Sequence, residues 1–230
     1  ALSILNWALF DKMSVHLGCS LAPMDMQTTI RPFGRPEMAI ANLMTAQLAR
    51  FYGASFSGHA GLSDAKLPSV EAGAQKALSA VPTLMVGGSF WMDVGLLAID
   101  EVCSPIQMVL DSEFLGAMER FTQQTYVNDE TIGLEMILEA GPGGQYLDKM
   151  HTARHFREEI WNPSLWSQTM LRSWLDGERS LDVDRAREVV LKVQADIARK
   201  SELPGMSESF EREVLNVIQR ARDDLVSAGS

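Results

Sequence analysis

Hydrophobic and polar positions alternate along the chain with two different periods. Apolar residues recur at helical spacing and predict helices over residues 1–10, 36–53, 70–81, 103–125, 129–140, 183–197 and 210–225. Shorter apolar runs predict buried strands over residues 13–19, 54–56 and 84–93. Strands that alternate with helices are typical of an α/β fold, and this pattern accounts for three or four βα units.

Capping residues support several of these boundaries. Pro36 opens one helix, with Glu37 near the positive end of the helix dipole. Ser69 and Asn128 are suited to cap two further helices, because their side-chain oxygens accept hydrogen bonds from free amides of the first turn. The run Gly-Pro-Gly-Gly at residues 141–144 would end the helix that Asn128 begins.

The amino-acid composition argues for some classes of protein and against others. Hydrophobic residues make up 46% of the 230 positions and charged residues 22%, which are ordinary values for a globular chain. The formal net charge of −10 argues against nucleic-acid binding, since a phosphate backbone requires a basic surface. Two cysteines, Cys19 and Cys103, make no disulfide framework, so we expect a cytoplasmic protein. Residues 1–10 are apolar but too few to span a membrane, so we expect no membrane association.

Polar groups crowd into the stretch from residue 58 to residue 73. A short apolar strand that includes Phe56 precedes this stretch, and its glycines permit a sharp exit from the strand. Four polar residues then follow closely, namely His59, Ser63, Asp64 and Lys66. A strand, a polar loop and a helix in this order predict a functional site in the loop.

A motif in this loop resembles that of a known enzyme family. It consists of Ser63-Asp64-Ala65-Lys66 followed by Ala72-Gly73 and Lys76, and it is similar to the central motif of the trimethylamine methyltransferase (MttB) superfamily. In the trimethylamine enzymes of that family, a pyrrolysine stands immediately before Ser-Asp-Ala-Lys. Leu62 takes that position here, so the chain resembles the branch without pyrrolysine, whose known members act on quaternary amines such as glycine betaine.

Further segments extend the resemblance from about residue 34 to residue 176. They are Gly-x-Pro-Glu at residues 34–37, Val-Asn-Asp-Glu-Thr at 127–131, Gly-Pro-Gly-Gly at 141–144, and His-Thr-Ala-Arg-His-Phe-Arg at 151–157 with Trp161 and Pro163. Several independent motifs in one order argue against a chance match.

The resemblance implies a TIM (β/α)8 barrel with its site at the carboxyl ends of the strands. The chain would supply the C-terminal part of this barrel as βα units in residues 1–125, followed by a helical region in residues 126–230 packed on the barrel. The start at Ala1 has neither a helix cap nor a methionine, so we expect a fragment of a longer methyltransferase. A partial barrel exposes strand edges, so it would dimerise, retain its missing half or aggregate, and we expect a homo-oligomer.

The activity implied by the resemblance is corrinoid-dependent methyl transfer. In the family, a methyl group passes from a methylated amine to cob(I)alamin on a separate corrinoid protein, so we expect no cofactor bound tightly to this chain. A quaternary amine already carries a leaving group that departs neutral, so the enzyme mainly has to bind and align it. Leu62 and Asp64 are the catalytic candidates by their place in the motif. Without pyrrolysine, no covalent adduct would activate trimethylamine itself, which makes it a disfavoured substrate.

Recognition of a permanent cation requires aromatic faces and carboxylates. The nearest aromatic candidates are Phe56, Phe90 and Trp91, and Asp64 or Asp93 would balance the charge of the substrate. These assignments have structural alternatives, since an aromatic residue at a strand end also suits a core and Asp64 also suits a loop cap.

A betaine also carries a carboxylate, which a basic side chain would hold. His59, Lys66 or Arg31 would suit this role. Lys66 would equally suit an ion pair with Asp64, so both interpretations stay open.

Two other functions stay open. His16 and Cys19 would suit a zinc-thiolate methyltransferase, but a zinc site needs three protein ligands and residues 16 and 19 face opposite sides of a strand. We therefore assign no metal ligand. The other alternative is a non-catalytic chain that binds only a small cation or a partner protein. His151 and His155 share a helix face, and with Arg154 they would form an anion or metal site or a set of surface contacts.

Overall fold

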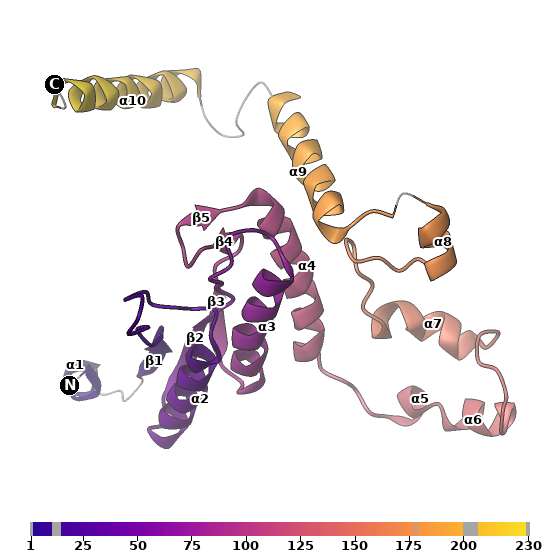
Figure 1. Cartoon of the computed structure of the whole chain (residues 1–230). Helices are drawn as coiled ribbons and strands as arrows, with labels where there is room; N and C mark the ends of the chain where they lie inside the picture. Colours follow the sequence, from indigo (N-terminus) through magenta and orange to yellow (C-terminus); the bar gives the residue numbers. More distant parts are fainter. Residues whose placement is uncertain (1, 11–14, 178, 200–206, 229–230) are drawn as a thin grey trace. The chain divides into compact units, whose positions relative to one another are not determined.

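The structure, a computed structural model, describes residues 2–10, 15–177, 179–199 and 207–228. The chain divides into two compact units, residues 1–190 and residues 191–230. The first unit holds a small parallel sheet with its helices, and the second holds the end of helix α9 and helix α10 (Figure 1). Among the described residues, no helix combines the length and the apolar composition that a bilayer span requires.

Three short parallel strands form the sheet. β1 (His16–Cys19) pairs with β2 (Ser55–Ala60), and β2 pairs with β3 (Ser89–Met92), so the strand order follows the chain. Helix α2 (Pro36–Phe51) connects β1 to β2, and helix α3 (Val70–Met85) connects β2 to β3. α2 contacts β1 and β2, while α3 contacts β2, β3 and α2. These two consecutive βαβ units confirm the α/β class that the sequence predicts.

One face of the sheet packs against these helices. Cys19 of β1 and Phe56 of β2 point to this face and pack with Ala46 of α2. Gly58 follows Phe56 by two residues and so lies on the same face. A Cβ atom at this position would come within 2.6 Å of the Cγ2 of Thr83, so glycine is what lets α3 approach β2 closely.

Helix α4 (Pro105–Thr122) follows the third strand. Between them lies a two-stranded antiparallel hairpin of β4 (Leu96–Leu97) and β5 (Val102–Cys103), which the sequence pattern did not predict because two-residue strands carry almost no periodicity. α4 joins the core through a cluster formed with β2 and α3, whose buried residues are Ala60, Ala80 and Met118.

Three of the predicted helix starts are confirmed. Pro36 stands in the first turn of α2. The side chain of Ser69 accepts a hydrogen bond from the amide of Ala72 at 3.2 Å. Asn128 forms a capping box with Thr131, in which each side chain accepts from the amide of the other residue.

Three predicted elements are wrong in their extent. The strand predicted over residues 54–56 runs on to Ala60, so His59 lies on β2 and not in the loop. Residues 84–85 belong to α3, and the strand begins only at Ser89, after Gly87 has left the helix with a φ of 79°. The predicted helix over residues 129–140 is divided by Gly133, whose φ is 62°, into α5 (Asp129–Ile132) and α6 (Leu134–Ala140). Gly133, in the left-handed conformation, thus divides a helix that the apolar spacing alone would continue, whereas α3 runs past its predicted end at residue 81 as far as Met85.

The remaining helices agree with the sequence pattern or add short segments. They are α1 (Leu2–Phe10), α7 (Met150–Glu159), α8 (Leu171–Asp176), α9 (Asp182–Arg199) and α10 (Glu208–Ala228). The predicted strand over residues 13–19 begins at positions 13 and 14, which lie outside the described residues. A closed barrel and a domain division at residue 125 stay predictions, although three parallel strands are compatible with part of an α/β barrel.

Leu62 lies in the core, in the loop after β2. Its side chain is 2% exposed and packs with Phe33 and Met38. Leu96 and Ile99, which are partly buried, pack against the same cluster. The hydrophobic contacts of Leu62 therefore connect the loop before α2 with the hairpin after β3.

Replacement of Leu62 by alanine should lower the free energy of unfolding by about 2–5 kcal/mol, because a packed core collapses only partly around the lost atoms. Leu67 is the matched control, since it lies five residues further on and is 71% exposed. Leu67→Ala should change the free energy of unfolding by less than about 0.5 kcal/mol. Chemical denaturation followed by circular dichroism measures both, and equal effects would contradict the buried position of Leu62.

Glu113 of α4 anchors the segment that follows α7. Its carboxylate accepts hydrogen bonds from the hydroxyl of Ser164 at 2.5 Å and from the amides of Leu165 at 2.8 Å and Trp166 at 3.0 Å. Burial works to raise the pKa of this carboxyl, but these hydrogen bonds outweigh burial and hold the pKa below its ordinary value of 4.5. The resulting stabilisation is complete above pH 4.5 and is lost as the pH falls through the lower pKa of the folded state.

Glu113→Gln should therefore lower the free energy of unfolding at pH 7 by about 1–3 kcal/mol, because the amide loses charge-assisted hydrogen bonds. The difference from the wild-type chain should shrink as the pH falls below 4.5, where the wild-type carboxylate becomes protonated. Urea denaturation at several pH values measures this difference. Glu119→Gln, at an exposed position of the same helix, is the control. A difference that does not vary with pH would contradict the anchoring role of Glu113.

Candidate functional site

A pocket of about 530 Å³ lies on the sheet face opposite α2 and α3. Its polar and aromatic lining residues come from the three strands and the turns that follow them, and they are His16, Ser20, Ser57, His59, Trp91 and Asp93. The register pairs Gly18 with Ser57, and His59 with Trp91, so these positions share one face. This face is polar, whereas the face toward the helices is apolar.

His59 and Asp93 form a hydrogen-bonded pair between the ends of β2 and β3. The Nε2 of His59 contacts the Oδ2 of Asp93, and its Nδ1 lies 3.1 Å from the Oγ of Ser20. A carboxylate only accepts hydrogen bonds, so the proton is on Nε2, which donates a hydrogen bond to Asp93. In the neutral ring, Nδ1 then accepts from the hydroxyl of Ser20. The side chains of His59 and Asp93 are 27% and 36% exposed, which leaves them within reach of a ligand.

His16 is held by two hydroxyl groups on the same sheet face. Its Nδ1 lies 2.9 Å from the Oγ of Ser55, and its Nε2 lies 2.7 Å from the Oγ of Ser57. Ser57 is buried, so its hydrogen bond with His16 is shielded from water. Imidazole and hydroxyl groups thus supply hydrogen-bonding partners along β1 and β2.

Trp91 presents an exposed aromatic side chain next to Asp93. It is 72% exposed, which is unusual for a tryptophan on a strand. Among the described residues that line the pocket, Asp93 carries the carboxylate and none is a lysine or an arginine. An aromatic face beside a carboxylate suits an organic cation better than an anion.

The other two predicted aromatic residues lie elsewhere. Phe56 packs with Cys19 and Ala46, and Phe90 packs against the cluster that joins β2, α3 and α4. Phe56 and Phe90 therefore do not line this pocket, and their contact with a substrate stays a prediction. Side chains alternate along a strand, so residue 90 faces the helices while Trp91 faces the pocket.

The loop residues of the motif do not line this pocket. The carboxylate of Asp64 accepts from the amides of Phe33 at 2.9 Å and Gly34 at 3.1 Å, and so fixes the loop before α2. Lys66 donates to the main-chain carbonyl of Asp64 instead of pairing with its carboxylate. Leu62 lies in the core. The catalytic roles of Leu62 and Asp64 and the substrate contact of Lys66 stay predictions.

Phe33 connects this loop to the pocket. Its ring packs with Leu62, and the centroid of the ring lies 6.4 Å from that of His59. Arg31 lies over the same ring at 5.0 Å and donates to the carbonyl of Ser20. The motif loop and the pocket are thus neighbours through one aromatic side chain.

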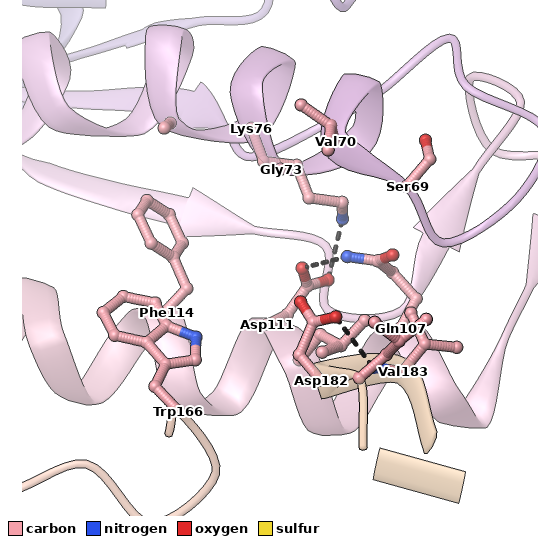
Figure 2. Close-up of a pocket in the computed structure, with 13 residues that line it drawn as sticks. Ser69, Val70, Gly73, Lys76, Gln107, Asp111, Phe114, Trp166, Asp182 and Val183 are labelled. Carbon is pink, nitrogen blue, oxygen red and sulfur yellow. Dashed lines mark hydrogen bonds and ion pairs between the residues drawn. The ribbon is translucent and has the colours of Figure 1, made fainter. Parts of the chain in front are cut away.

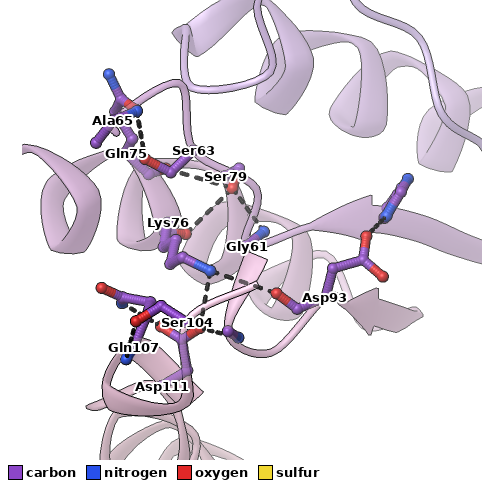
Figure 3. A network of polar contacts seen from close by, with 12 residues as sticks. Gly61, Ser63, Ala65, Gln75, Lys76, Ser79, Asp93, Ser104, Gln107 and Asp111 are labelled. Atoms are coloured by element: carbon purple, nitrogen blue, oxygen red, sulfur yellow. Dashed lines mark hydrogen bonds and ion pairs between the residues drawn. The ribbon is translucent and has the colours of Figure 1, made fainter. Parts of the chain in front are cut away.

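A buried polar network lies behind the pocket, on the helix side of the sheet, and the sequence analysis missed it (Figure 3). The Nζ of Lys76 lies 2.8 Å from the Oδ2 of Asp111 and 3.3 Å from the main-chain oxygen of Asp93. The side chains of Lys76 and Asp111 are 1% and 2% exposed. The signal in the sequence was the presence of Lys76 in the motif, but its partner lies 35 residues further on and no local pattern joins the two.

A second pocket, of about 610 Å³, lies between α3, α4 and the start of α9 (Figure 2). Its walls include the aromatic side chains of Phe114 and Trp166 and the amide of Gln107. The Nε2 of Gln107 donates to Asp111 at 2.7 Å, while its buried Oε1 has no partner among the described residues. The Lys76–Asp111 pair thus separates this pocket from the turn that carries Asp93.

Two groups of residues were considered as metal sites, namely His16 with Cys19, and His151 with Arg154 and His155. Among the described residues, no group of three His, Cys, Asp or Glu side chains lies together as a metal ion requires. Cys19 is buried in the core, whereas His16 lies on the opposite face. The rings of His151 and His155 lie 4.6 Å apart and both contact Glu130, so they connect α7 to α5.

Comparisons with known proteins agree with the resemblance of the loop motif. The chain is 26% identical over 179 residues to trimethylamine methyltransferase MttB of Desulfitobacterium hafniense (strain DSM 10664 / DCB-2), which covers 78% of this chain and 36% of that protein. It is 27% identical over 161 residues to glycine betaine methyltransferase of Desulfitobacterium hafniense (strain Y51), with 70% and 34% covered. It is 28% identical over 160 residues to trimethylamine methyltransferase MttB of Methanosarcina barkeri, with 70% and 32% covered.

The chain spans about a third of the length of the curated relatives that it matches. The family model described as trimethylamine methyltransferase (MTTB) matches residues 11–225, which is nearly the whole chain. The chain therefore belongs to the trimethylamine methyltransferase family.

Proposed function

We propose that the chain is part of a methyltransferase that uses a quaternary amine such as glycine betaine, and that the pocket at His59, Trp91 and Asp93 binds this amine. The main support is the exposed aromatic face of Trp91 beside the only carboxylate among the described lining side chains, that of Asp93. A relative named glycine betaine methyltransferase and a leucine at the motif position 62 also favour a quaternary amine.

The chemistry of the substrate explains what the pocket has to supply. A quaternary nitrogen has no N–H group, so hydrogen bonds cannot recognise it, and an aromatic face with a carboxylate takes their place. When a methyl group leaves, the amine departs without a charge, so no general acid is required. Binding and alignment of the methyl group are then the main contributions of the chain.

The residues of the pocket fit these tasks. In the proposal, Trp91 and Asp93 hold the ammonium group, and His59 fixes the orientation of Asp93 through its Nε2. His16 and Ser57 lie on the neighbouring strands and would meet the carboxylate of a betaine. We propose cob(I)alamin on a separate corrinoid protein as the methyl acceptor, whose cobalt supplies the nucleophile. The pocket lies on the sheet face that α2 and α3 leave uncovered, which leaves the bound methyl groups accessible to a partner.

We also propose that the open faces of the chain are covered in the working enzyme. Helix α2 exposes an apolar stripe of four residues, namely Ile40, Met44, Leu48 and Phe51. β1 and β3 are the outer strands of the described sheet. Further βα units of a barrel, or a second copy of the chain, would cover both features.

Trp91→Leu should weaken the binding of glycine betaine about 2- to 30-fold, which is the range that cation–π contacts contribute. The variant should leave the binding of 3,3-dimethylbutanoate unchanged, because this molecule has the same shape but carries a neutral carbon in place of the nitrogen. Isothermal titration calorimetry measures both ligands. Trp7→Leu, at an exposed tryptophan outside the pocket, is the control. Equal losses for both ligands would show that Trp91 does not recognise the positive charge.

Asp93→Asn should reduce the affinity for glycine betaine about two- to fivefold, since it removes a partly exposed charge from beside the cation.

Transfer of a methyl group is followed separately, as the betaine-dependent loss of cob(I)alamin absorbance. Binding without transfer would support the alternative of a chain that only binds a cation. Stoichiometric zinc in the purified chain would favour the zinc-thiolate alternative. Failure of the wild-type chain to bind any methylated amine would contradict the proposed function.

A further inference from the structure

His59 and Asp93 are held by side chains that approach from the helix side of the sheet. The main-chain carbonyl of His59 accepts a hydrogen bond from the Nδ2 of Asn42 at 2.9 Å. The main-chain carbonyl of Asp93 accepts one from the Nζ of Lys76 at 3.3 Å. Asn42 is 0% exposed and Lys76 is 1% exposed, so water does not compete for these hydrogen bonds. Each member of the pocket pair thus has its own buried donor behind it.

Asp111 fixes the turn after β3 at a second point. Its Oδ2 accepts from the Nζ of Lys76 and from the amide of Gly95, both at 2.8 Å. Its Oδ1 accepts from the Nε2 of Gln107 at 2.7 Å. Gly95 has a φ of 84°, which side chains other than glycine rarely adopt. One buried ion pair therefore holds both the carbonyl of Asp93 and the amide of Gly95 (Figure 3).

Stability alone does not explain a charged pair at this place. The cost of removing two charges from water offsets much of their attraction, and an apolar pair of similar volume is often as stable. The interface of α3 and α4 already contains an apolar cluster with Ala80 and Met118. What the charged pair adds is a strong donor and a strong acceptor that fix one turn of the main chain.

We propose that Lys76 and Asp111 are positioning residues for the His59–Asp93 pair. They hold the main chain of the turn at residues 93–95, and the turn aims the carboxylate of Asp93 at the Nε2 of His59. Neither residue lines the pocket that contains His59. This inference concerns the geometry of the pair, and only its extension to ligand binding rests on the proposed function.

The double variant Lys76→Met with Asp111→Asn tests this proposal. It removes both charges and nearly preserves the volume. The oxygen of the new side-chain amide still accepts from the amide of Gly95, and its NH2 group donates to the Oε1 of Gln107 once the Gln107 amide turns over, because Nε2 faces this position in the wild-type chain. We expect its thermal midpoint to stay within about 5 °C of the wild-type value. We expect His59 to lose the predominance of the Nε2–H tautomer, which the nitrogen shifts of the ring report in NMR spectra. Glycine betaine should bind up to about fivefold more weakly, which is the loss expected when the charge of Asp93 is removed altogether.

Controls make the spectroscopic result specific. The chain has four histidines, and His59→Gln assigns the signal of His59. The ion pair of Lys149 with Glu139, at 2.7 Å, provides the matched control, because Lys149→Met with Glu139→Gln removes a pair far from the turn in sequence. This control should leave the His59 signal and the binding of glycine betaine unchanged.

The outcomes separate the two proposals. A folded double variant that keeps the wild-type tautomer of His59 would overturn the positioning role, whatever its affinity for glycine betaine. Failure of the wild-type chain to bind glycine betaine would count against the proposed function, while the tautomer of His59 would still decide the positioning role. If the double variant does not fold, Asp111→Glu takes its place, because it keeps both charges and displaces the turn by one methylene. A folded Asp111→Glu chain should show a changed His59 signal, and an unchanged signal would overturn the proposal.

Discussion

The alternation of side chains along three parallel strands is the constraint on which the rest of the structure depends. Because successive residues point to opposite faces, the strands separate an apolar side, with Phe56 and Phe90, from a polar side, with His59 and Trp91. The apolar side takes up α2 and α3 and forms the core. The polar side carries the pocket. The register between β2 and β3 therefore determines which residues of the two strands lie on the same face.

The helix side also contributes polar groups, and they act on the pocket from behind. Asn42 and Lys76 reach through the apolar layer to the main chain of His59 and Asp93. Gly58 faces Asn42 and Thr83 without a side chain, and so permits the close approach of the helices to β2. The residues with direct access to a ligand are thus supported by buried hydrogen bonds from α2 and α3. This arrangement gives Lys76, a residue of the family motif, a physical role that needs no contact with substrate.

Much of this fold follows from local sequence patterns. Helical spacing with Pro36, Ser69 and Asn128 locates the helix starts, since caps act within one turn. The break at Gly133 was missed because the surrounding apolar spacing continues through this glycine, and the boundary between α3 and β3 was misplaced because the apolar residues 84–86 suit a helix end as well as a strand. The β4–β5 hairpin was missed because each strand has only two residues.

The candidate site was predictable only in part. His59 was named from its place near the motif, and Trp91 and Asp93 from the end of a predicted strand. The structure brings all three to one pocket. Phe56 and Phe90 were placed there too, because the sequence alone does not say which face of a strand meets the helices. Ser57 and the Lys76–Asp111 pair depend on contacts between residues more than 30 positions apart, which no local pattern contains.

In the proposed function, the polar sheet face binds a quaternary ammonium group next to Trp91. NMR spectra of the indole N–H groups test it most directly, since the chain has five tryptophans and each gives its own signal. Titration with glycine betaine should move the signal of Trp91 and leave that of Trp166, at the second pocket, in place. Movement of the Trp166 signal alone, or of no signal at millimolar ligand, would contradict the account.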